Sequence, residues 1–480
     1  MSTISNVRWV GISQAGKLIV QLFSIILFAR FLGPADFGLY ALAMIFVNFA
    51  NILRDMGTSA ALIQRHALTG TFTDTVFWSN ALFGIILGLI MVTIAPIAAV
   101  GFQDSRLTGL LMTIAIIFPI SSSGSPHMAL LERESRFRTL AALELFSSFF
   151  GLAVGVISIL NKMGVYSLVF QTIATTCCSA LLLWAVSSYR PRFYWNKDEF
   201  ISLWRFSSHL VGFNIINYFS RNADSMLIGR LIGTVDLGIY NLAYRIMVFP
   251  IQSLTFVLNR ALLPAFSRQQ TDYALLGKNY LKALSFIALV TAPMMAGLWA
   301  LREPLITTFL GSDWIRVAGI LAWFAPIGFL QSLLSTTGGV FTAIGRTDLL
   351  RKIGFVCALV TVGMFVVSAS FGIIWISISF LFSTLFSFAF AFKILLNELD
   401  VKILFLLQTV WCQAFSAITM AFALSVLMHY IGPFINEKLI LATAIPAGAC
   451  IYFSLIHAFS RRLSSEILDL GRKVKNEVFG

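Results

Sequence analysis

The stretch "LFARFLGPADFGLYALA" at residues 27–43 returns 200 residues later as "LIGRLIGTVDLGIYNLA" at residues 227–243. In each copy an apolar run ends, a glycine-containing turn follows, and a second apolar run begins. Identical residues occupy these aligned pairs: Leu27 and Leu227, Arg30 and Arg230, Gly33 and Gly233, Asp36 and Asp236, Gly38 and Gly238, Tyr40 and Tyr240, Leu42 and Leu242, Ala43 and Ala243. We interpret each copy as a turn between two helices, in which Gly33 and Gly38 serve the turn backbone and Arg30 and Asp36 clasp it shut. The alternative is a direct role in substrate binding.

The composition predicts an all-α polytopic membrane protein. The 480 residues are 58% hydrophobic and only 11% charged, with a mean hydropathy of +0.87, whereas soluble domains carry about 25% charged residues. A bilayer core about 30 Å thick needs roughly 20 apolar residues per helix. About fourteen spans are expected, near 9–29, 37–53, 75–101, 107–125, 139–161, 164–188, 206–229, 237–258, 283–301, 317–343, 353–370, 372–392, 403–428 and 439–458.

The positive charges predict how these spans are oriented. With the N-terminus inside, the segments that face the cytoplasm carry 24 of the 34 Lys and Arg residues, the outer segments carry 7, and 3 fall within spans. Such a bias is the usual mark of cytoplasmic loops. We therefore expect a multi-pass membrane protein with both termini in the cytoplasm. The net charge of +13 then follows from topology, and no nucleic-acid partner is indicated.

The repeat predicts the domain organisation. Six expected spans separate the two copies, so both point the same way through the membrane, as in a parallel repeat. We expect an N-lobe at residues 1–195, a C-lobe at 196–400, an added helix pair at 401–460 and a basic cytoplasmic tail at 461–480. The two six-helix lobes would surround a central cavity.

Two polar stripes indicate what lines that cavity. The first expected helix carries Gln14, Lys17, Gln21 and Ser24, and the seventh carries Asn214, Asn217, Arg221 and Asp224 at the same spacing. Each set occupies roughly 80° of a helix. Polar groups in hydrocarbon are costly unless they face a bundle interior or water, so matching stripes in two lobes favour a shared cavity. Local packing between helices is the alternative, and Arg221 and Asp224 could also neutralise each other.

The predicted lining is basic, which suits a phosphate or diphosphate cargo. The predicted substrate-binding residues are Lys17, Arg221, Gln21, Asn217, Arg54, Arg245 and Arg260. The predicted ion-coupling carboxylates are Asp224, Asp55 and Glu144. The scattered histidines and cysteines show no metal-ligand spacing, and no catalytic arrangement of side chains is present. The sequence therefore predicts no enzyme activity, no cofactor and no metal site.

The ordered motifs resemble a known family. "LFARFLGPADFGLYALA", "RDMGTSAALIQR" (54–65), "GRLIGTVDLGIYNLAYRIMVFP" (229–250), "LNRALLPAFSRQQ" (258–270) and "FLGSDW" (309–314) are similar to the polysaccharide transporter family. They resemble most the Wzx-type exporters, which include colanic acid and succinoglycan translocases, within the multidrug/oligosaccharidyl-lipid/polysaccharide superfamily. The family's Asp-x-Gly signature falls on Asp55 and Gly57.

This resemblance implies a flippase for undecaprenyl-diphosphate-linked oligosaccharides that works by alternating access, for exopolysaccharide or lipopolysaccharide synthesis. It also implies a location in a bacterial cytoplasmic (inner) membrane. The implied partners are the lipid-linked oligosaccharide, membrane lipids and other polysaccharide-assembly proteins. A small-molecule or drug cation antiporter of the same superfamily is one alternative, and it predicts an acidic cavity. A non-transporting scaffold of a polysaccharide-assembly complex is another, and it predicts that the cavity charges are dispensable. A membrane glycosyltransferase or polymerase would need a large outer catalytic loop, which this sequence lacks.

Overall fold

The computed structural model describes residues 3–55, 58–65, 68–267, 272–431 and 436–459, and in these ranges the regular elements are helices. They divide between two compact units, Met1–Asn241 and Leu242–Gly480. The first holds α1(Thr3–Ala29), α2(Pro34–Asp55), α3(Thr58–Gln64), α4(Gly70–Phe102), α5(Arg106–Ile114), α6(Ile117–Arg133), α7(Phe137–Leu160), α8(Tyr166–Val186), α9(Lys197–Leu231) and the start of α10(Thr234–Ser267). The second holds the rest of α10 and α11(Tyr273–Ala300), α12(Arg302–Phe309), η1(Ser312–Trp314), α13(Ile315–Leu334), α14(Thr337–Ala343), α15(Thr347–Ser368), η2(Ala369–Phe371), α16(Ile373–Glu398), α17(Ile403–Ile431) and α18(Glu437–Phe459).

Twelve segments within the described ranges are long and apolar enough to cross a membrane. Three of them join more than one helical element: α5 and α6 form one segment, η1, α13 and α14 another, and α15 and η2 a third. The all-α polytopic prediction is confirmed. The two expected spans outside these twelve fall in α9 and α10, which are 35 and 34 residues long. Both helices have the length to cross a membrane.

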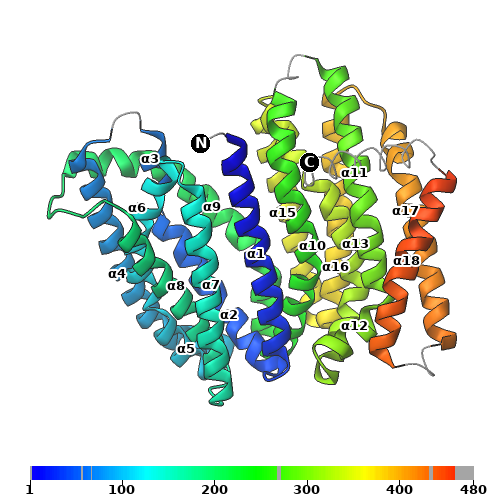
Figure 1. Ribbon diagram of the computed structural model, residues 1–480, viewed down its shortest axis with the longest axis horizontal. Coiled ribbons are helices and arrows are strands. Elements are labelled where there is room, and N and C mark those ends of the chain that lie inside the picture. The colour runs from blue at the N-terminus through cyan, green and yellow to red at the C-terminus, as the bar shows by residue number, and fades with distance from the viewer. Residues whose placement is uncertain (1–2, 56–57, 66–67, 268–271, 432–435, 460–480) are drawn as a thin grey trace. The chain divides into compact units, whose positions relative to one another are not determined.

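Within the first unit, α7 packs between α1 and α8, and α6 packs against both α4 and α8 (Figure 1). Small residues permit this close packing. A Cβ added at Gly155 of α7 would lie 2.8 Å from the Phe28 ring and 2.9 Å from Cβ of Gln171. A Cβ at Gly84 of α4 would likewise lie 2.8 Å from the carbonyl oxygen of Phe118 in α6.

The connection between α8 and α9 is held against α4. Asp74 of α4 is buried and accepts hydrogen bonds from the Tyr189 hydroxyl at 2.6 Å and the Arg192 backbone N–H at 3.1 Å. The Trp78 indole N–H donates to the Arg192 carbonyl at 2.8 Å, and its ring stacks on Phe193 with a centroid distance of 4.7 Å. Burial and the bond to Asp74 raise the pKa of Tyr189, which therefore remains a donor at neutral pH.

The start of α9 continues this attachment. The Asn196 side chain caps the helix by accepting from the N–H groups of Asp198 and Glu199, and Glu199 accepts from the Thr75 hydroxyl of α4 at 3.1 Å. Further along, the Tyr218 hydroxyl donates to the Ile45 carbonyl of α2 at 2.5 Å. These contacts explain why α9 belongs to the first compact unit, although the repeat assigns it to the second lobe. The lobe boundaries stay a prediction drawn from the repeat.

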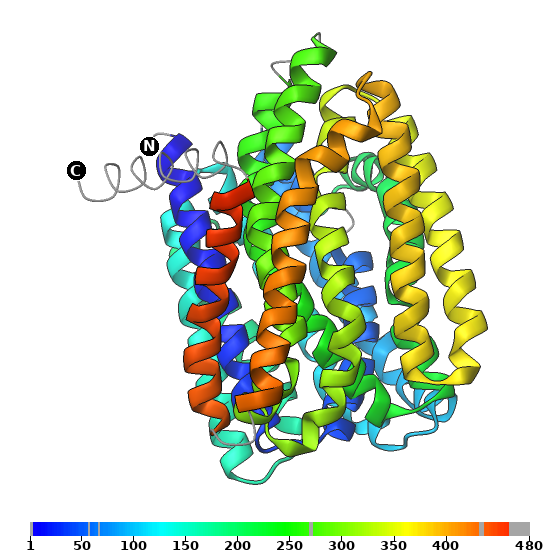
Figure 2. The same cartoon turned by 90° about the vertical axis from the view of Figure 1, so that its right-hand side faces the viewer.

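Within the second unit, α11 packs against α13 and α17, α13 against α16, and α15 against α16 (Figure 2). Buried polar side chains join these apolar helices. Thr291 and Ser332 share a hydrogen bond of 2.9 Å between α11 and α13, and the Gln413 amide of α17 donates to the Ser285 hydroxyl at 2.8 Å. Helix α18 is bound to α11 by the Tyr452 hydroxyl, which donates to the Leu289 carbonyl at 3.1 Å.

Two apolar cavities also lie in the second unit. One, of about 650 Å³, lies among α10, α11, α12, α17 and α18, and the other, of about 630 Å³, lies among α11, α13, α16 and α17. Their lining is aliphatic and aromatic, with Tyr452 in the first and Trp299 and Ser425 in the second as its polar members. Neither lining contains a charged side chain, so neither cavity suits an anionic group.

Candidate functional site

Lys17, the basic residue near the middle of α1, lies in an ion pair. Its Nζ is 2.6 Å from Oε2 of Glu144 on α7, and the Ser13 hydroxyl donates to the same oxygen at 2.6 Å. The two charged side chains are 35% and 26% exposed, so the pair is reachable from outside the packed helices. Lys17 was predicted to bind the substrate and Glu144 to bind a coupling ion, and the structure brings these two residues together.

The rest of the α1 stripe divides between two faces. Ser24 is buried and hydrogen-bonded to the Gln171 side chain of α8 at 3.0 to 3.1 Å. Gln21 is exposed and Gln14 is half-buried. With roughly 100° of rotation per residue, Ser13, Lys17 and Ser24 lie within about 40° of one another, on the side of α7 and α8. Gln14 and Gln21 are rotated further round the helix.

The stripe on α9 is described only in part. Asp224 is buried, and it accepts hydrogen bonds from the Tyr240 hydroxyl at 2.8 Å and the Ser225 N–H at 2.6 Å. Arg221 is exposed. The side chains of Asn214 and Asn217 lie outside the described residues. Asp224 is thus engaged in holding the end of α9 to the first turns of α10.

The other predicted site residues lie on α2 and α10. An Arg54 guanidinium nitrogen donates to the Ser121 hydroxyl of α6, and Arg245 is half-buried on α10. The side chains of Asp55 and Arg260, and all of Gly57, lie outside the described residues. No group of three or more metal-ligating side chains was found among the described residues.

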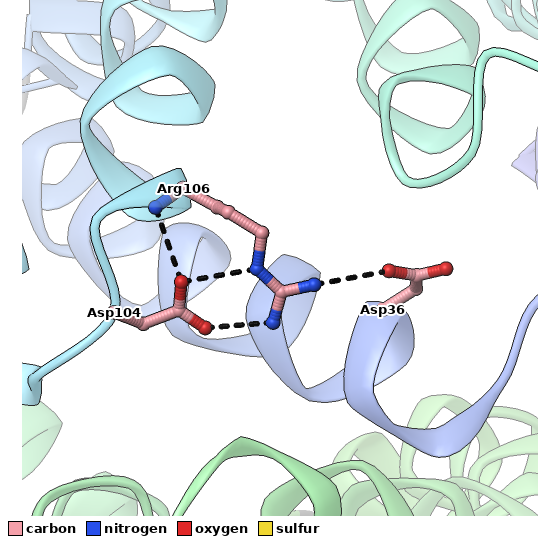
Figure 3. A network of polar contacts seen from close by, with 3 residues as sticks. All are labelled: Asp36, Asp104 and Arg106. Carbon is pink, nitrogen blue, oxygen red and sulfur yellow. Dashed lines mark hydrogen bonds and ion pairs between the residues drawn. The ribbon is translucent and has the colours of Figure 1, made fainter.

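The first repeated turn is closed by a residue that the sequence analysis did not single out. Asp36 pairs with Arg106 at the start of α5, at 3.7 Å (Figure 3), and the expected clasp between Arg30 and Asp36 stays a prediction. Arg106 also binds both oxygens of Asp104, at 3.1 and 2.8 Å. These bonds hold the pKa of Asp104 below its usual value. The clasp therefore joins the repeated turn to the connection between α4 and α5.

Gly33 lies in the turn as predicted, whereas Gly38 does not. Gly33 ends the turn before Pro34 begins α2, and its counterpart Gly233 has φ of 121°, a conformation that favours glycine. Gly38, in contrast, lies inside α2, where its backbone faces that of Gly238 in α10. In the sequence, the only sign of this contact is that Gly38 and Gly238 occupy the same position in the two copies of the repeat. The structure shows that the two glycines contact each other.

Comparison with solved structures identifies the fold. The fold resembles that of the lipid II flippase MurJ in an inward closed conformation, with a TM-score of 0.74 and 16% identity over 94% of this chain and 98% of that chain. A multidrug resistance MATE family transporter of the MOP superfamily matches with a TM-score of 0.59 and 14% identity over 80% of this chain and 94% of that one. The chain therefore has the fold of a MOP-superfamily membrane protein.

The family follows from the sequence matches. The profile of the family described as "Polysaccharide biosynthesis protein" matches residues 27–319. The chain belongs to this family of Wzx-type flippases, which are transporters and not enzymes, and the resemblance found in the motifs is confirmed. Its relatives include the succinoglycan biosynthesis transport protein ExoT of Rhizobium meliloti, 27% identical over 98% of this chain and 96% of that protein. The teichuronic acid biosynthesis protein TuaB of Bacillus subtilis is 28% identical over 72% of each chain, and the lipopolysaccharide biosynthesis protein WzxC of Escherichia coli is 24% identical over 73% and 72%.

Proposed function

We propose that this protein moves undecaprenyl-diphosphate-linked oligosaccharides from the inner to the outer leaflet of a bacterial cytoplasmic membrane. The full-length match to ExoT, whose name describes it as a transport protein of succinoglycan biosynthesis, is the observation that carries this proposal. The basic residues on apolar helices give the physical support. A diphosphate cannot cross hydrocarbon unaided, whereas Lys and Arg side chains in a hydrated cavity offer it charge-assisted hydrogen bonds.

In the proposed mechanism, two lobes of six spans enclose the cavity, and α9 and α10 complete a set of fourteen spans with both termini in the cytoplasm. The diphosphate binds Lys17, with Arg221, Gln21, Asn217, Arg54, Arg245 and Arg260 as further proposed ligands. The isoprenoid tail stays in lipid while the lobes rock to open the cavity on alternate sides. Protons or sodium ions drive the step through Glu144, Asp55 or Asp224. Other polysaccharide-assembly proteins supply and consume the substrate.

The test is flipping of a diphosphate-linked glycolipid in proteoliposomes. Wild-type protein is compared with Lys17→Ala and Arg221→Ala, and Lys402→Ala serves as the control because Lys402 is exposed in the connection between α16 and α17. We expect flipping by the wild type and the control, and a loss of about tenfold or more in each cavity variant, which corresponds to about 1.4 kcal/mol. Equal flipping by the wild type and all three variants would contradict the assignment of Lys17 and Arg221 to the substrate site. Absence of flipping by folded wild type, with transport of an organic cation instead, would favour the antiporter.

A further inference from the structure

Lys17, the residue proposed to bind the substrate, is already paired with Glu144. The ammonium group of Lys17 is 2.6 Å from a carboxylate oxygen that also accepts from Ser13. Ser13 and Lys17 are one helical turn apart on α1, so both reach the same oxygen of α7. A phosphate could bind Lys17 closely only after this contact has been broken or lengthened.

The carboxylate and a phosphate offer the same kind of ligand. Each presents an anionic oxygen to a compact ammonium group that acts as a point charge. Glu144 can therefore hold Lys17 in place when no substrate is bound, and the ammonium group is not left alone in hydrocarbon, where an unpaired charge is costly. The exposure of both side chains, 35% and 26%, gives an incoming anion access to the pair.

Loss of Lys17 would in turn leave Glu144 without a cation. The Glu144 carboxylate has Lys17 and Ser13 as its polar partners among the described side chains. Helices α1, α6 and α8 pack against α7. The other ionisable groups described on these three helices are His127, Glu132 and Arg133 of α6 and Tyr166, Cys177 and Cys178 of α8. On α7 itself the other ionisable group is Arg138, which lies over the Trp9 ring at 5.2 Å. None of these groups is bonded to the Glu144 carboxylate.

We propose that Glu144 is an internal competitor of the substrate: a phosphate of the lipid-linked diphosphate replaces the carboxylate at Lys17, and Glu144 takes up a proton. This inference rests on the proposed function, and it adds a route by which substrate binding is coupled to proton uptake at the same site. Release of the substrate in the outer leaflet reverses the exchange, so the proton travels outward with the substrate. Lys17 returns to Glu144, and the proton leaves. Glu144 then reports on substrate binding, and an inward ion gradient would drive the step through Asp55 or Asp224. Binding then weakens as the pH rises, by at most tenfold per pH unit for one proton.

The test measures proton uptake on binding by the full-length protein in nanodiscs. The probe is a short-chain polyprenyl diphosphate-linked sugar, a diester whose phosphates each carry one ionised oxygen and do not titrate near neutrality. Calorimetric titration in two buffers of different ionisation enthalpy gives the number of protons bound. We expect close to one proton for the wild type, and none for Glu144→Gln, which should bind more tightly by a factor within the roughly 5- to 150-fold range of typical coupling between ligands. Lys17→Gln should weaken binding, and Arg138→Gln serves as the control with unchanged proton uptake.

The outcomes separate the two proposals. Binding by the wild type without proton uptake overturns the exchange and leaves the flippase in place, and this measurement needs no variant to fold. Binding by Glu144→Gln with wild-type affinity also overturns it. No binding by folded wild type overturns the proposed function together with the exchange.

Discussion

Gly38 of α2 and Gly238 of α10 face each other through their backbones in the first unit. A Cβ added at either glycine would lie 2.9 Å from the backbone nitrogen of the other. At Gly38 it would also overlap the carbonyl oxygen of Thr234, and at Gly238 it would overlap that of Pro34. Both sets of contacts follow the 200-residue offset of the sequence repeat. The two copies of the motif therefore meet each other, and a side chain at either glycine would prevent the contact.

The first prediction concerns this contact. An added Cβ would clash with backbone atoms, which cannot move to another rotamer as a side chain can. Gly38→Ala and Gly238→Ala should therefore each destabilise the protein by about 1–3 kcal/mol. Thermal unfolding in detergent, followed by loss of the monodisperse protein, measures the effect. Because both changes disrupt the same contact, the double variant should lose less stability than the two single variants added together.

Gly33→Ala is the matched control, since no heavy atom lies within 4 Å of the added Cβ. Its effect should remain within about 0.5 kcal/mol, as for surface changes away from special features. Equal losses at Gly33 and Gly38 would show that the loss reflects helix or turn propensity and not the contact with Gly238.

The second prediction uses the Arg106 clasp. Arg106 lowers the pKa of Asp104 by hydrogen bonding to the ionised carboxylate, so the folded state gains stability above the ordinary aspartate pKa of about 4 and loses it as the pH falls through the lower folded value. Arg106 is 51% exposed, which limits the contribution to about 1 kcal/mol or less. Arg106→Gln should therefore be less stable than wild type at neutral pH. Unfolding midpoints measured from pH 7 to pH 3 should converge, and a constant difference would contradict the assignment.

The third prediction compares two tyrosines at equivalent positions. The buried Tyr240 hydroxyl donates to the Asp224 carboxyl at 2.8 Å, whereas the Tyr40 hydroxyl is 2.8 Å from the Thr172 hydroxyl. Either change removes a hydrogen bond, but loss of the Tyr240 hydroxyl also leaves a buried carboxyl short of a partner, which is costly. Tyr240→Phe should cost about 1.5–3 kcal/mol and Tyr40→Phe about 1 kcal/mol or less.

Thermal unfolding of both variants measures the difference, and Asp224→Asn combined with Tyr240→Phe tests its origin. The double variant should lose less than the two single changes added together, because they share one bond. Equal losses for Tyr40→Phe and Tyr240→Phe would indicate that Asp224 does not depend on the hydroxyl.

Hydropathy predicted most of the helices because a membrane demands long apolar runs with internally satisfied backbones. The start of α9 was harder to predict. The segment at 196–206 is charged, yet it forms one helix with the expected span at 206–229. Asn196 caps this helix, and Asp198 and Glu199 lie in its first turn, where the helix dipole favours negative charge. Polarity alone suggests a boundary at the lipid surface, whereas capping determines where the helix begins.

The site was predictable only one helix at a time. Spacing placed Lys17 on a polar stripe, but its partner Glu144 lies on α7, 127 residues away, and helical periodicity carries no information about contacts between helices. The cost of an isolated intramembrane charge was the available signal that Lys17 and Glu144, both on apolar helices of the first unit, would pair. The Arg106 clasp was less predictable still, because charged residues near helix ends are common and exposed.

The last prediction concerns His127, which is fully buried in α6. Its ring lies 4.6 Å from that of Trp184, 5.4 Å from that of Tyr189 and 6.3 Å from that of Phe77, measured between centroids. Neither ring nitrogen has a hydrogen-bond partner among the described atoms. A buried polar group without partners costs about 1–3 kcal/mol, while an aromatic ring of similar size would keep the packing.

His127→Phe should therefore leave the stability unchanged or raise it by up to about 2 kcal/mol, and His127→Ala should lower it by about 3 kcal/mol through the cavity it leaves. Thermal unfolding of both variants, with flipping measured in parallel, tests this expectation. Loss of flipping by a stable His127→Phe protein would instead show that the imidazole takes part in transport, since packing would then be intact and only the polar ring nitrogens would be missing.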